Sequence, residues 1–233
     1  MKKEKTYFYE INSVVINVLP YIILAFMCIL TFIIVKVFNI DFKWLSYPLL
    51  LPILLIPYFI IHEILHSIGY VVNGADFKKV TYGCHLEKGV LCCSCKQNIS
   101  KKNVMWSLMY PFIFIGVITY VIGLVFNIPT LVLLSIFNLA GCSGDIVMFI
   151  AFMKIKDFKF FEYDNPIGFG IITSENLENK KLFGLKPYKE ENVTQTLDKK
   201  ITVSKISIIF LIAYYAFTLL PLLLTLLFEF LEL

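Results

Sequence analysis

The sequence predicts an all-α polytopic membrane protein with about five transmembrane helices and a small cytoplasmic β-hairpin loop. Three observations support this prediction: the composition, the length of the apolar segments and the placement of the lysines. Hydrophobic residues make up 58% of the 233 positions, and charged residues make up only 16%. A soluble domain of this length does not need so much apolar surface, so the composition indicates a membrane protein.

Five apolar segments are long enough to cross a hydrocarbon core of about 30 Å, which takes about 20 helical residues. We interpret residues 1–233 as a single integral membrane domain, with a cytoplasmic loop at about 73–103 and a cytoplasmic segment at about 154–205. Glycines and short β-prone pieces in the loop predict the hairpin. The expected spans are about 14–37, 46–72, 104–126, 129–153 and 206–228.

The lysines predict the orientation of these spans. All 21 basic residues are Lys, and most lie before the first span, between the second and third, or between the fourth and fifth. By the positive-inside rule these regions and the N-terminus are cytoplasmic, so we expect a multi-pass protein of the cell membrane with the lipid bilayer around it. Lysines without arginines, and no nucleic-acid-binding fold pattern, argue against a nucleic-acid partner.

One polar pentapeptide, His62-Glu63-Ile64-Leu65-His66, interrupts the second span. On a helix, residues four apart share a face, so His62 and His66 can hold one metal ion between them. Glu63 then lies beside the open coordination position, where it can take a proton from a water as a general base. Polar groups in a membrane-length apolar segment are costly, which favours a functional reading over a coincidence.

A catalytic zinc usually takes three protein ligands, and we predict Asp145 in the fourth span as the third. At 1.5 Å per residue, His66 and Asp145 lie about 10 Å and about 14 Å from the cytoplasmic boundary, so they can meet at one level. Gly141 and Gly144 would let the two helices approach closely. Two alternatives remain: Asp145 caps a helix break or pairs with a Lys, or Glu87, about twenty residues after the motif, is the third ligand.

Three further residues are weaker candidates. Asn138 lies two turns before Asp145 on the same face, where it could donate to an oxyanion or bind the substrate backbone; the alternative is an ordinary interhelical hydrogen bond. Asp164 and Asn165 form either a plain turn or a loop that returns to the catalytic mouth.

The loop at 73–103 also carries His85 and four cysteines, which form either a second zinc site or a set of reduced thiols. Their spacing lacks a clean C-x-x-C pair and therefore favours reduced thiols. The cysteines are Cys84, Cys92, Cys93 and Cys95.

Several of these features together resemble the zincin peptidases of unknown function in bacterial membranes, which are distantly similar to the site-2 protease intramembrane zinc metalloproteases. The resemblance implies a zinc-dependent peptidase with His62, His66 and Asp145 as ligands and Glu63 as general base. In one respect the chain differs, because site-2 proteases carry the third ligand in an Asp-Gly setting and this chain has Gly-Asp. The matching elements are His62–His66, Tyr82-Gly83, Pro111, Ser143-Gly144-Asp145-Ile146 and Asp164-Asn165-Pro166, within about residues 55–170.

The function predicted from the sequence is a zinc-dependent intramembrane endopeptidase that hydrolyses a peptide bond of a membrane-associated protein or peptide. The alternative is a non-catalytic membrane zinc-binding or transport protein that uses the same ligands. A transporter needs a continuous polar path, and the outer halves of the second and fourth spans are almost wholly apolar. A third reading, a scaffold that binds peptides without cutting them, has no use for Glu63 as a base.

Overall fold

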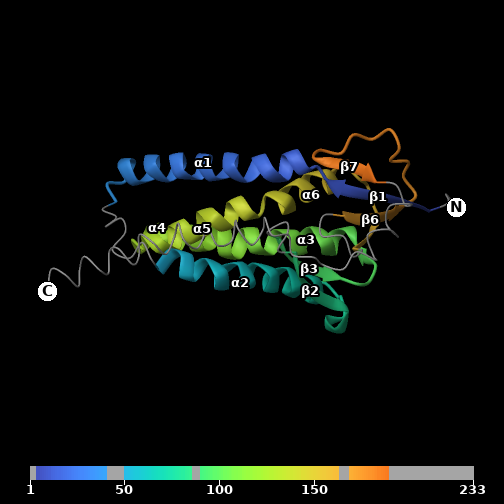
Figure 1. Cartoon of the computed structure of the whole chain (residues 1–233), viewed down its shortest axis with the longest axis horizontal. Coiled ribbons are helices and arrows are strands. Elements are labelled where there is room, and N and C mark those ends of the chain that lie inside the picture. Colours follow the sequence, from blue (N-terminus) through green and yellow to red (C-terminus); the bar gives the residue numbers. More distant parts are fainter. Residues whose placement is uncertain (1–3, 41–49, 86–89, 163–167, 189–233) are drawn as a thin grey trace, which may run out of the picture.

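The computed structural model describes residues 4–40, 50–85, 90–162 and 168–188. Over these ranges the helices run side by side along the long axis, and the strands gather at one end (Figure 1). The predicted fifth span at 206–228 lies outside the described residues. So do three of the weaker site candidates, Glu87, Asp164 and Asn165.

Four apolar stretches of the described chain correspond to the first four predicted spans. Three helices are long and apolar enough to cross a membrane, and a fourth crossing results if a bent helix pair counts as one span. That pair is α5 and α6, which meet at an angle of 48°. The helices are α1 (Ser13–Val37), α2 (Leu50–Val72), α3 (Lys101–Pro111), the π-helix η3 (Phe112–Ile118), α4 (Thr119–Val125), α5 (Pro129–Gly141) and α6 (Ser143–Met153), with a 3-10 turn η1 at Phe77–Lys79.

The strands form two antiparallel sheets. The predicted hairpin is present as β2 (Val80–His85) and β3 (Val90–Cys95). A five-stranded sheet in the order β4-β5-β6-β1-β7 was not predicted, so the all-α part of the fold prediction is not confirmed. Its strands are β1 (Lys5–Ile11), β4 (Ile99–Ser100), β5 (Lys159–Glu162), β6 (Gly168–Thr173) and β7 (Leu185–Tyr188).

Helix α1 is the most exposed of the apolar helices. Only 6% of its most apolar 18-residue window is buried, and large side chains such as Phe26 and Phe32 lie on its surface. An apolar surface of this length is unfavourable in water and suits contact with lipid acyl chains. The helix begins directly after β1, where the Asn12 side chain accepts a hydrogen bond from the amide of Val14 and caps the first turn.

Aromatic packing joins α6 to the five-stranded sheet. The rings of Phe152, Phe160 and Phe169 lie 5.4–5.6 Å apart, centroid to centroid, and all three are almost completely buried. Rings at these separations pack well and bury large apolar areas. This contact fixes the far end of the helix that carries Asp145.

Close helix approaches occur at glycines other than the two that we predicted. A Cβ at Gly116 would lie 2.6 Å from a side-chain carbon of Leu139, and one at Gly123 would lie 2.8 Å from Val132. At Gly141 and Gly144 the nearest atoms would be at 3.5 Å and 3.8 Å, which are ordinary contacts. The prediction that these two glycines permit a close approach is therefore wrong.

Candidate metal centre

Helix α2 carries two histidines on the face that it turns to the protein interior. His62 and His66 are each 7% exposed, and their Nε2 atoms lie 3.1 Å apart. The spacing of four residues places the two rings one above the other on one side of the helix, as the sequence predicts.

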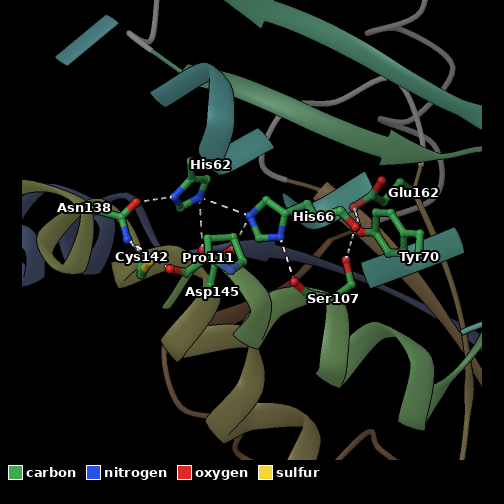
Figure 2. A network of polar contacts seen from close by, with 9 residues as sticks. All are labelled: His62, His66, Tyr70, Ser107, Pro111, Asn138, Cys142, Asp145 and Glu162. Carbon is green, nitrogen blue, oxygen red and sulfur yellow. Dashed lines mark hydrogen bonds and ion pairs between the residues drawn. The ribbon is translucent and has the colours of Figure 1, made fainter. Parts of the chain in front are cut away.

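Asp145 reaches both histidines from α6. Its Oδ2 lies 3.5 Å from Nε2 of His62, and its Oδ1 lies 3.5 Å from Nε2 of His66. The residue lies in the first turn of α6, just after the break at Cys142. A helix break is thus present beside Asp145, as one alternative proposed, but the carboxylate faces the imidazoles (Figure 2). The positive end of the α6 dipole favours a carboxylate at this position.

The other ring nitrogen of each histidine is held by an oxygen. Nδ1 of His62 lies 2.8 Å from Oδ1 of Asn138, and Nδ1 of His66 lies 3.0 Å from the backbone carbonyl oxygen of Ser107. Both oxygens can only accept, so each Nδ1 carries a proton and donates it. The amide orientation of Asn138 is supported by its Nδ2, which donates to the carbonyl of Pro111 at 3.2 Å.

These contacts leave each Nε2 facing the carboxylate, where a neutral imidazole with its proton on Nδ1 presents the Nε2 lone pair. Three acceptors that face one another repel unless a cation lies between them, so this donor set fits a metal ion. The spacing fits as well: ligand bonds of about 2.05 Å at tetrahedral angles place ligand atoms about 3.3 Å apart. The three observed separations are 3.1, 3.5 and 3.5 Å.

A close approach of α2 and α3 brings Ser107 to His66. A Cβ at Gly69 would lie 2.6 Å from Cα of Ser107, so only glycine permits this distance. The Ser107 hydroxyl also donates to the backbone carbonyl of His66 at 2.8 Å. Gly69 is one turn after His66, so this close contact of the two helices lies beside the cluster of metal ligands.

The β2–β3 hairpin lies against the same turn of α2. The backbone amide of Cys93 in β3 donates a hydrogen bond to the Glu63 carboxylate, which also interacts electrostatically with His66, His62 and Asp145. From β2, the Tyr82 hydroxyl donates to Oγ of Ser67 at 2.7 Å. Glu63 therefore lies between the hairpin and the cluster of possible metal ligands.

A second buried carboxylate connects the hairpin to the five-stranded sheet. Glu162 in β5 accepts from the Tyr70 hydroxyl at 3.2 Å and from the backbone amide of Cys95 at 2.9 Å. Burial raises the pKa of the Glu162 carboxyl to about 7, although the hydrogen bonds from Cys95, Ser94 and Tyr70 act in the opposite direction. Figure 2 shows this pair beyond His66, on the side away from Asn138.

The structure brings together four of the predicted site residues and adds others. His62, His66 and Asp145 form the one group of possible metal ligands found in the described part of the chain, and Glu63 is adjacent. The amide of Asn138 is bonded inside the protein, which favours the interhelical alternative; its oxyanion role stays a prediction.

The sequence reasoning missed Ser107 and Glu162. A signal for Ser107 was available, because Pro111 stands four residues later in a span and must leave one helical carbonyl without its partner. No comparable signal marks Glu162, because its hydrogen-bond donors, the Tyr70 hydroxyl and the Cys95 backbone amide, come from distant segments.

The cysteine loop shows no second metal cluster among the residues described. Cys93 and Cys95 are buried and form no disulfide within the described part of the chain, and burial raises the pKa of the Cys95 thiol. The side chains of Cys84, His85 and Cys92 lie outside the described residues, so reduced thiols stay the prediction and a second zinc site stays its untested alternative.

Span-length apolar helices surround a buried cluster of two histidines and one carboxylate that could hold a metal ion, with a glutamate beside it, and this is the arrangement that a helical metallopeptidase requires. Residues 55–158 match the model of the family described as "Putative zincin peptidase". The matched range includes the His62–His66 motif and Asp145, and the family suggests a zinc metallopeptidase. The predicted resemblance to this family is confirmed, whereas the similarity to site-2 proteases stays a prediction. No curated protein and no solved structure matches the chain.

Proposed function

We propose that the chain is a zinc-dependent endopeptidase that cuts a membrane-associated protein or peptide. The proposal rests mainly on one observation. The Nε2 atoms of His62 and His66 and the Asp145 carboxylate converge at separations of 3.1–3.5 Å, and Glu63 directly follows His62 on the same helix. The family match supports the zinc and the peptidase chemistry. Apolar helices around the cluster support a site within the membrane.

His62, His66 and Asp145 would hold the metal, and Asn138 and the Ser107 carbonyl would keep both imidazoles oriented for it. When bound, zinc would polarise the scissile carbonyl and make a water more acidic. Glu63 then accepts the proton of the attacking water and passes it to the leaving amine. The backbone amide of Cys93 holds the Glu63 carboxylate near the cluster before substrate arrives.

The substrate must present an extended backbone, because a helix keeps its carbonyls in internal hydrogen bonds. The β2–β3 hairpin packs against α2 beside Glu63, so it offers strand backbone close to the proposed catalytic centre. We infer that an extended substrate segment pairs with this hairpin, where main-chain hydrogen bonds would give affinity with little sequence preference.

Metal analysis combined with proteolysis tests this function. The wild-type protein should contain one zinc and cut a model membrane peptide, and a chelator should abolish cleavage. His62→Ala and Asp145→Ala should lose both zinc and activity. Glu63→Gln, which keeps the size of the side chain, should retain zinc and lose cleavage by a factor of about 10² to 10⁴. The matched control is Asp157→Ala, which removes an exposed carboxylate outside the cluster and should keep zinc and activity.

The outcomes separate the competing functions. A zinc-loaded wild type that cuts no membrane peptide, or a Glu63→Gln variant that cuts as fast as wild type, rejects the peptidase mechanism. Zinc uptake into vesicles that depends on His62 and Asp145 would identify a transporter instead.

A further inference from the structure

Pro111 ends α3, directly before the π-helix η3. In a continuous α-helix, the carbonyl of residue 107 would accept from the N–H of residue 111. Proline has no N–H, so the Ser107 carbonyl has no partner at that position. The next amide does not replace it, because the N–H of Phe112 donates to the carbonyl of Met109.

The carbonyl left free by Pro111 is the one that His66 uses. Nδ1 of His66 donates to it at 3.0 Å, and both Ser107 and the His66 ring are buried. A buried carbonyl without a donor costs free energy, so the proline creates an acceptor that needs a partner from another helix. The close approach at Gly69 brings α2 near enough to supply it.

We propose that Pro111 is a positioning residue for the metal centre: its missing N–H reserves the Ser107 carbonyl for His66 and so directs Nε2 of His66 at the metal. This inference rests on the proposed metal function. Pro111 supports the other histidine too, since its own carbonyl accepts from Nδ2 of Asn138, whose Oδ1 accepts from His62. Pro111 thereby supports both imidazoles. Its missing N–H leaves the Ser107 carbonyl to His66, and its own carbonyl accepts from Asn138, which holds His62 (Figure 2).

Pro111→Ala separates the effect of the missing N–H of this residue from the effect of its carbonyl. Alanine supplies an N–H that competes with His66 for the Ser107 carbonyl, but it keeps the carbonyl that holds Asn138. We therefore expect His66 to lose its partner while His62 keeps its own. Loss of such an outer partner of a metal-bound histidine weakens metal binding about 10- to 100-fold.

The direct test is magic-angle-spinning NMR of the full-length, metal-free protein in lipid, with ¹⁵N-histidine and carbonyl-¹³C-serine. The chain has three histidines, and Ser107-Leu108 is its one Ser-Leu step, so a ¹³C-serine, ¹⁵N-leucine sample identifies the Ser107 carbonyl signal. The wild type should show one histidine Nδ1 in dipolar contact with that carbonyl. Pro111→Ala should lose this contact, with the His62 signals unchanged. Zinc affinity, measured by chelator competition, should fall as given above.

The matched control is Pro20→Ala, which removes the proline inside α1 and should change neither the contact nor the zinc affinity. The proposal is overturned if the wild type lacks the contact, or if Pro111→Ala keeps both the contact and full zinc affinity. If the Pro111→Ala chain does not fold, the wild-type measurement still applies, and a wild type without the contact still overturns the proposal. A chain that shows the contact but neither binds zinc nor cuts peptides would refute the proposed function and keep the helix–histidine contact.

Discussion

The close contact between Gly69 and Ser107 predicts that a larger side chain at position 69 disturbs the metal centre. In Gly69→Ala the added Cβ would lie 2.6 Å from Cα of Ser107, where carbon atoms prefer about 3.5–4.0 Å. Backbone atoms of α3 cannot turn away as a flexible side chain can, so the two helices must separate by about 1 Å. Such a shift would lengthen the 3.0 Å contact between His66 and the Ser107 carbonyl beyond hydrogen-bonding distance.

The expected cost of Gly69→Ala follows from the contacts that it breaks. The two hydrogen bonds between His66 and Ser107 contribute about 1 kcal/mol each, and the replacement of glycine by alanine in a helix returns about 0.5–1 kcal/mol. We therefore expect a net loss of about 1 kcal/mol in stability, together with zinc affinity lowered about 10- to 100-fold. The assays are thermal unfolding in detergent and chelator competition.

Gly141→Ala is the matched control for this prediction. It is the same substitution in a helix, but its Cβ would lie 3.5 Å from Phe59, an ordinary contact. We expect unchanged zinc affinity and equal or higher stability. If Gly69→Ala binds zinc as tightly as Gly141→Ala and unfolds at the same temperature, the close approach does not hold the histidine in place.

Three further predictions concern the surroundings of the metal. Asn138→Ala should weaken zinc binding about 10- to 100-fold, because His62 loses the acceptor of its Nδ1 proton; equal affinity in titration would exclude this role. Glu162 has a folded pKa of about 7 against an ordinary 4.5, so its contribution to stability should be complete below about pH 4.5 and fall by up to about 3 kcal/mol as pH rises through 7. Glu162→Gln should flatten that part of the unfolding profile, and a profile identical to wild type would refute the assignment. Zinc at 100 times its Kd should stabilise the wild type by about 2.7 kcal/mol, a gain that a chelator removes and that should be absent in Asp145→Ala.

The part of the site that depends on local chain geometry could be predicted from the sequence. The four-residue spacing of His62 and His66 places both rings on one helix face in any α-helix. The prediction of Asp145 as a ligand required a comparison of depth along two spans. The structure places its carboxylate 3.5 Å from Nε2 of both histidines. The glycines that permit helix contact were not predictable from their nearness to Asp145, because each contact depends on which side chain faces the glycine from another helix.

The five-stranded sheet could not be predicted because three of its four pairings, β1 with β6, β1 with β7 and β4 with β5, are non-local. β1 is a seven-residue strand in front of an apolar helix, and its partner β6 lies far along the chain, where Lys5 pairs with Thr173. Alternation over short strands gives a weak signal when no hairpin joins them. The β2–β3 hairpin, whose strands are neighbours in sequence, was predicted.

The pairing of β1 with β6 also sets an order of events during synthesis. A ribosome that adds about 5–20 residues per second needs roughly 10 to 30 s to proceed from Lys5 to Thr173. For most of that interval the first helix is already made, but the strand in front of it has no partner. Closure of the sheet is therefore a late step of biogenesis, and a chain truncated before residue 168 would leave its amino-terminal strand exposed to quality-control proteases.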